Sequence, residues 1–227
     1  FSGTVHYSAC LDGTTETDYH VSEQLYEVTA LEELSDRSVL MTVRGRHEGQ
    51  QAAFAMAVRA LDRPQAVYGV EKGDRRIAVR VETDARQGAI LYLERAVTLA
   101  TSRIEADPAG AARRLLEETS RRSFAEVRAG SIQRWHNLWE DSDVRIDGDP
   151  DAQLGARYSI YHLLMAASQD DPGVSIPAKG LSGTGCWGRV FWETDIHMTP
   201  FFNFTQPRLA RNLAMFRCRT LDGARRN

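Results

Sequence analysis

Residues 96–108 decide the fold class of the chain, and they read Ala96-Val97-Thr98-Leu99-Ala100-Thr101-Ser102-Arg103-Ile104-Glu105-Ala106-Asp107-Pro108. The first five residues continue a strand-like pattern that runs through the preceding part of the chain. Aspartate often caps the N-terminus of a helix and proline is favoured at the first helical position, so Asp107-Pro108 predicts a helix start. The sequence therefore predicts a β-rich part before about residue 105 and a helical part after it.

Short apolar segments alternate with turn residues upstream of this change. The segment at residues 76–82 alternates apolar and polar side chains, which is typical of a strand with one buried face. Similar segments cover residues 38–43, 53–58, 89–93 and 96–100, and glycine-containing turn signals separate them. Several strands at this spacing predict an antiparallel β-sandwich.

Apolar residues follow a helical period downstream of the change. One helix is predicted from Asp107 to about residue 121, and a second from about residue 123 to 140. The helix predicted over residues 151–168 is apolar on most of its circumference, which indicates burial on several sides, as in an inner helix of a multi-helix barrel. Gln206-Pro207 predicts the start of the last helix.

Composition and charge exclude several classes of protein. The 227 residues are 42% hydrophobic and 26% charged, which excludes a disordered chain. The net charge of −3, with both signs mixed along the sequence, argues against nucleic acid as a partner. No apolar run approaches the roughly 20 residues that span a bilayer, and no signal peptide is visible, so we expect a cytoplasmic protein without a membrane partner.

The stretch between the last two predicted helices, residues 172–206, carries the residues best suited to chemistry. It is long for a loop in a compact domain, and such loops are often functional. An aromatic ring stacks on the apolar face of a sugar, and a carboxylate accepts hydrogen bonds from its hydroxyl groups, so Trp192 and Glu193 are candidates for a sugar subsite. The alternative is structural: Trp192 belongs to the core, and Glu193 is an acid favoured by a helix N-terminus.

Other residues of this stretch suggest an anion contact but no cofactor or metal site. Lys179 is a candidate contact to an anion or ligand, but it precedes the glycines that follow, so the stretch is not a P-loop. Asp195 and His197 lack a third ligand nearby, and Cys10, Cys186 and Cys218 lie too far apart for a CxxC pair, so no metal site is predicted. The glycines that could present backbone N–H groups to an anion are Gly180, Gly183, Gly185 and Gly188.

Several blocks from about residue 133 onward have an order and spacing that resemble a known family. They include Trp139-Glu140-Asp141-Ser142-Asp143-Val144, Arg157-Tyr158-Ser159-Ile160-Tyr161-His162, Ala178-Lys179-Gly180-Leu181-Ser182-Gly183, Phe191-Trp192-Glu193-Thr194-Asp195-Ile196 and Leu221-Asp222-Gly223-Ala224-Arg225. This pattern resembles glycoside hydrolase family 65, the maltose, kojibiose and trehalose phosphorylases. Leu11-Asp12-Gly13 and Thr101-Ser102-Arg103 resemble the N-terminal domain of the same family.

The resemblance implies an architecture of several domains that combines β and α parts. Residues 1–105 are expected to form the later part of an N-terminal antiparallel β-sandwich, and residues 106–142 a helical linker. Residues 143–227 are expected to supply the first helices of an (α/α)₆ barrel, too few to close its ring.

The resemblance also implies an inverting disaccharide phosphorylase, which cleaves an α-glucosidic bond with inorganic phosphate and releases β-glucose 1-phosphate. The glutamic acid that protonates the glycosidic oxygen in such enzymes is expected beyond Asn227. No catalytic residue is therefore assigned, and the chain alone is expected to be inactive. The implied partners are a disaccharide α-glucoside and phosphate as co-substrate, with no cofactor, in a protein that forms a homo-oligomer when intact.

Two residues of the candidate stretch take their role from this resemblance. Trp192 and Glu193 fall on the Trp and Asp of the family's Phe-Trp-Asp-Thr-Glu motif, which binds the non-reducing glucose. Glu193 stands where the family has Asp, and Asp195 stands where it has Glu. Arg189 stands where the family usually has His. Arg189 is therefore, like Lys179, a candidate contact to substrate or anion. Two alternatives stay open: an α-glucoside or trehalose hydrolase, and a non-catalytic carbohydrate-binding protein.

Overall fold

The computed structural model describes residues 2–14, 25–46, 49–180 and 185–226. The chain divides into two compact units, Phe1–Val127 and Arg128–Asn227. No helix in these described ranges combines the length and the apolar composition that crossing a membrane requires.

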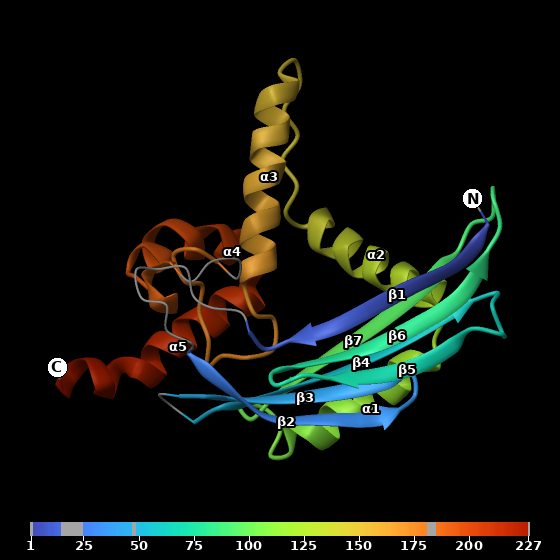
Figure 1. The fold of residues 1–227 in the computed structure, drawn as a ribbon. Helices are drawn as coiled ribbons and strands as arrows, with labels where there is room; N and C mark the ends of the chain where they lie inside the picture. The colour runs from blue at the N-terminus through green and yellow to red at the C-terminus, as the bar shows by residue number, and fades with distance from the viewer. Residues whose placement is uncertain (1, 15–24, 47–48, 181–184, 227) are drawn as a thin grey trace. The chain divides into compact units, whose positions relative to one another are not determined.

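The first unit is built on two antiparallel sheets, which confirms the predicted β-sandwich (Figure 1). One sheet has the strand order β1-β6-β5 and the other has the order β2-β3-β4-β7. The strands are β1 (Gly3–Asp12), β2 (Tyr26–Ser35), β3 (Ser38–Gly45), β4 (Gln51–Leu61), β5 (Val67–Lys72), β6 (Arg76–Ala85) and β7 (Tyr92–Thr101).

Alternating side chains explain why the two sheets pack face to face. Val39 and Met41 of β3 are buried in the same cluster as Ile77 and Val79 of β6, so the period of two directs one face of each strand into a shared core. Leu40, between Val39 and Met41, is fully buried in a different cluster. The larger sheet is therefore covered on both of its faces.

Helix α1 (Pro108–Ser120) covers the second face of the larger sheet. The side chain of Asp107 accepts a hydrogen bond from the Gly110 N–H at 2.9 Å, which confirms the helix start predicted at Asp107-Pro108. Ala55 of β4 and Ala112 of α1 are fully buried in the cluster between the helix and the sheet. Alanines on both sides let the helix lie close to the strands.

Helix α2 (Phe124–Glu140) begins with a reciprocal cap and extends into the second unit. The Glu126 carboxylate accepts hydrogen bonds from the N–H and the hydroxyl of Ser123, each at 2.8 Å. These hydrogen bonds, the backbone one first, hold the pKa of Glu126 below its ordinary value. This is the capping-box arrangement, which places the start of the second predicted helix at Ser123.

The second unit is helical, and its described residues form one core. Its elements are α3 (Pro150–Ala166), a 3₁₀ turn η1 (Gly185–Gly188), a single π-helical turn η2 (Thr194–Met198), α4 (Thr199–Thr205) and α5 (Pro207–Arg226). Phe202 of α4 is fully buried among Leu164 of α3, Ile176 of the connecting segment and Leu209 of α5. Ile176 and Met198, which lie before and after the candidate residues in the sequence, both belong to or pack against this core.

Helix α3 is less buried than its sequence predicts. Only Ile160 and Leu164 of this helix are buried, whereas Leu154 is 69% exposed and Tyr158 is 64% exposed. The predicted burial on several sides is therefore wrong for Leu154 and Tyr158, which the described residues leave largely exposed.

Candidate functional site

Trp192 and Glu193 lie side by side in the turn that leads into η2. The Trp192 side chain is 61% exposed, which removes this residue from the core and with it the structural alternative for the indole. Glu193 occupies the N-cap position of η2, yet its exposed side chain makes no capping hydrogen bond. Trp192 therefore lies outside the core of the described residues, whereas Glu193 is an exposed acid at the start of η2, where the structural alternative also places it.

Thr194 anchors this turn from inside the unit. Its side chain is 2% exposed, and its hydroxyl donates a hydrogen bond to the Ile176 carbonyl at 3.0 Å. The backbone N–H of Asp195 donates to the Trp192 carbonyl at 3.0 Å, which closes the turn around Glu193. The short polar side chain of Thr194 thus ties the turn to the segment that follows α3.

Arg217 of α5 anchors the same turn from its other side. Its Nε donates a hydrogen bond to Asp195 Oδ2 at 2.8 Å, and its Nη2 donates to the Phe191 carbonyl at 2.6 Å. Asp195 is therefore the ion-pair partner of Arg217 within the protein. Among the described residues, no group of three or more His, Cys, Asp or Glu side chains is arranged to hold a metal ion.

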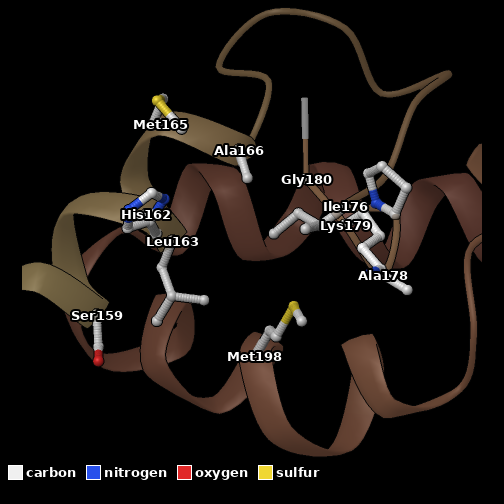
Figure 2. Close-up of a pocket in the computed structure, with 11 residues that line it drawn as sticks. Ser159, His162, Leu163, Met165, Ala166, Ile176, Ala178, Lys179, Gly180 and Met198 are labelled. Atoms are coloured by element: carbon white, nitrogen blue, oxygen red, sulfur yellow. The ribbon is translucent and has the colours of Figure 1, made fainter. Parts of the chain in front are cut away.

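Lys179 lies elsewhere and lines a mostly apolar cavity of about 410 Å³. Figure 2 shows this cavity between α3, the segment of residues 176–180 and Met198. Ser159, His162 and Lys179 supply the polar side chains of the lining, and Leu163 and Met198 are among its apolar ones. Trp192, Glu193 and Arg189 are not among the described residues that line it.

Arg189 and the glycines occupy the loop before this turn. Arg189 is exposed, and its backbone N–H donates to the Cys186 carbonyl at 3.0 Å, directly after η1. The Gly180 N–H donates to the Pro177 carbonyl at 2.9 Å, so this N–H is engaged within the protein rather than presented to an anion. Gly183 lies outside the described residues, and the structure does not test its predicted role.

The geometry supports one chemical capability best. An exposed indole and an exposed carboxylate stand next to each other on a turn that is anchored at Phe191, Thr194 and Asp195. An aromatic face and a carboxylate acceptor at fixed positions suit a sugar, which offers apolar C–H groups on one face and hydroxyl groups at its edge. Sequence reasoning selected this pair as candidates but did not single out Arg217, which resembles any other arginine on the polar side of a predicted helix.

Similarity to known proteins covers both units. Residues 1–138 match the model of the glycosyl hydrolase family 65 N-terminal domain, and residues 157–227 match that of the family 65 central catalytic domain. Kojibiose phosphorylase of Halothermothrix orenii is 32% identical over 205 residues, which cover 85% of this chain and 26% of that protein. The α,α-trehalose phosphorylase of Thermoanaerobacter brockii is 33% identical over 151 residues, covering 66% of this chain and 19% of that protein.

A solved structure has the same fold over nearly the whole chain. It is described as "Putative kojibiose phosphorylase from human microbiome", and it aligns with a TM-score of 0.64 and 20% identity over 96% of this chain and 30% of its own. The chain thus spans about a quarter of the length of the first of these relatives. Because the N-terminal model alone covers more than half of its residues, the chain belongs to glycosyl hydrolase family 65.

Proposed function

We propose that the protein is an inverting disaccharide phosphorylase that binds the non-reducing glucose of an α-glucoside at Trp192 and Glu193. The observation that carries the proposal is the turn at residues 191–195, which fixes an exposed indole beside an exposed carboxylate. The relatives are kojibiose and trehalose phosphorylases, which supports the class of reaction.

The reaction exchanges one bond at the anomeric carbon for another. The glycosidic C–O bond breaks while a phosphate oxygen bonds to the anomeric carbon from the opposite face, and a protonated carboxyl gives its proton to the departing oxygen. Phosphate is already a nucleophile, so the reaction needs no second carboxylate as a base and no cofactor. The products are β-glucose 1-phosphate and a free sugar, and we assign the acid to no residue of this chain.

The residues of the turn hold the substrate in this proposal. The Trp192 ring stacks on the apolar face of the glucose, and the Glu193 carboxylate accepts hydrogen bonds from its hydroxyl groups. Glu193 is one methylene longer than the Asp of the family motif, so its carboxylate extends farther from the backbone to contact the sugar. Lys179 and Arg189 are proposed as further contacts to the substrate or to phosphate.

The test uses the protein expressed from the whole gene. It is incubated with kojibiose, maltose, nigerose or trehalose, with and without phosphate, and the sugar phosphate and its anomeric configuration are followed by NMR. We expect β-glucose 1-phosphate from at least one disaccharide, and only when phosphate is present. Equal sugar release with and without phosphate overturns the proposal in favour of a hydrolase, and glucoside binding without turnover overturns it in favour of a carbohydrate-binding protein.

A further inference from the structure

One side chain spans the turn that carries the two exposed candidate residues. Arg217 contacts the backbone at Phe191, before Trp192, and the side chain of Asp195, after Glu193. Its Nη2 also lies 2.8 Å from Asp195 Oδ2. A single guanidinium thus holds both ends of the segment whose middle presents the indole and the carboxylate.

The shape of arginine suits these contacts. The guanidinium is a planar fork that directs several N–H donors in fixed directions, whereas the ammonium of lysine is a single point on a flexible chain. Nε donates to Asp195, and Nη2 donates to the Phe191 carbonyl and also lies close to Asp195. Lysine at this position keeps the charge but offers one nitrogen in place of this pair of donors.

Loss of this side chain leaves the turn anchored mainly from one side. Thr194 remains hydrogen-bonded to the Ile176 carbonyl, but among the described residues the Phe191 carbonyl then keeps only the longer contact from the Thr194 N–H at 3.4 Å. The side chains of Arg217 and Asp195 are each more than a third exposed, so their ion pair contributes little to overall stability. Its main effect falls on the position of the turn.

We propose that Arg217 is a positioning residue for the sugar subsite: it holds Phe191 and Asp195 so that Trp192 and Glu193 keep one orientation toward the substrate. This inference rests on the function proposed above. Arg217 itself touches neither the sugar nor phosphate in the proposal. Its effect on the disaccharide is transmitted through the turn.

The experiment compares Arg217→Gln, Arg217→Lys and Asp195→Asn in the protein expressed from the whole gene. Arg208→Gln is the matched control, because Arg208 lies on the same helix and forms an exposed ion pair with Asp170, away from the turn. Steady-state phosphorolysis gives kcat/KM for the disaccharide and, separately, KM for phosphate. Hydrogen exchange of the peptide that contains residues 190–196 reports the turn directly.

We expect Arg217→Gln to lower kcat/KM for the disaccharide by about tenfold to a hundredfold, since a misplacement of about 1 Å in a binding site has a cost of that order. KM for the disaccharide should rise whereas KM for phosphate should change by less than about twofold; a smaller folded fraction would instead lower kcat and leave both KM values unchanged. Arg217→Lys should recover part of the loss. The double variant with Asp195→Asn should lose less than the sum of the two single effects, because both act on one contact.

Two outcomes overturn the inference. One is an unchanged kcat/KM for the disaccharide in Arg217→Gln. The other is a change of the same size in the disaccharide and phosphate kinetic constants of Arg217→Gln, together with an equal loss of activity in Arg208→Gln. If the wild-type protein shows no phosphorolysis, the proposed function fails instead. Hydrogen exchange then still decides the anchoring: faster exchange of residues 190–196 in Arg217→Gln alone supports it, and equal exchange in both variants overturns it.

Discussion

The guanidinium of Arg157 donates two hydrogen bonds to the carboxylate of Asp143, from Nε to Oδ1 at 2.9 Å and from Nη2 to Oδ2 at 2.6 Å. Asp143 lies just after α2 and Arg157 lies within α3. The Gln153 side chain holds the same segment, because it donates to the Val144 carbonyl and accepts from the Ile146 N–H, both at 2.8 Å. Side chains of α3 therefore fix the connection that precedes it.

The ion pair between Asp143 and Arg157 makes the free energy of unfolding depend on pH in the acidic range. The hydrogen bonds from Arg157 hold the pKa of the Asp143 carboxyl below its ordinary value of 3.8. A lowered folded pKa gives stability that is complete above the ordinary value and is lost as the pH falls through the folded pKa. We expect Asp143→Asn to be less stable than wild type at pH 7 and the difference to shrink below about pH 4.

Urea unfolding of wild type and Asp143→Asn between pH 7 and pH 3 measures this difference. Asp147→Asn is the control, because the ion pair of Asp147 with Arg145 has both side chains 86% exposed. A stability difference for Asp143→Asn that stays constant across this range contradicts the assignment.

The hydroxyl of Thr194 is expected to stabilise the second unit. Thr194→Val keeps the volume but removes the donor to the Ile176 carbonyl inside the protein, which costs about 1–3 kcal/mol of unfolding free energy. Thr194→Ser keeps a hydroxyl at the same position and should lose less. Equal unfolding midpoints in urea for Thr194→Val and wild type would show that this hydrogen bond does not stabilise the turn.

Local patterns predicted the parts of the fold that depend on local physics. Period-two alternation identified β6, and Asp107-Pro108 identified the start of α1, because burial of one strand face and capping of one helix end are encoded in neighbouring residues. β1, β2 and β5 were not predicted. In β2, the Leu31-Glu32-Glu33-Leu34 segment fits a helical period, and the pairing of this strand with β3 determines its structure.

The candidate site likewise contains residues that the sequence alone indicates and residues that only the folded structure reveals. Trp192 and Glu193 could be selected by chemical type and by their place in an unusual loop, without knowledge of the fold. Arg217 could not, because it reaches Asp195 across 22 positions of sequence through the packing of α5. The exposure of Leu154 in α3 was equally inaccessible, since an apolar residue in a helix does not reveal whether anything covers it.

The indole of Trp192 is expected to carry much of the affinity for glucosides. Trp192→Ala should raise the dissociation constant for the disaccharide substrate by about tenfold, which equals roughly 1.4 kcal/mol, and Trp192→Phe should raise it less. Phe204→Ala is the control, because Phe204 is a 90% exposed aromatic residue of α4 outside the turn. Titration calorimetry measures the constants, and unchanged binding in Trp192→Ala would exclude the residue from the subsite.

The length and the charge of the acidic side chain at position 193 are expected to determine the affinity for the glucose unit. Glu193→Asp restores the carboxylate of the family motif, and Glu193→Gln keeps the length while removing the charge. Because hydrogen bonds to a charged acceptor are stronger, Glu193→Gln should weaken binding more than Glu193→Asp does. Dissociation constants for the same disaccharide decide the order, and equal affinities in wild type and Glu193→Gln contradict a role for the carboxylate.

The contact between α1 and the larger sheet is expected to reject a larger side chain. Ala112 and Ala55 are both fully buried there, and the Thr98 hydroxyl donates to the Ala112 carbonyl at 2.8 Å. Ala112→Leu must push the helix away from β4 and lengthen that hydrogen bond, at a cost of about 1–3 kcal/mol. Ala129→Leu adds the same atoms at an exposed position of α2 and should change stability by less than about 0.5 kcal/mol. Urea unfolding of both variants makes the comparison, and a loss in Ala112→Leu no greater than in Ala129→Leu would show that the helix can move off the sheet at no cost.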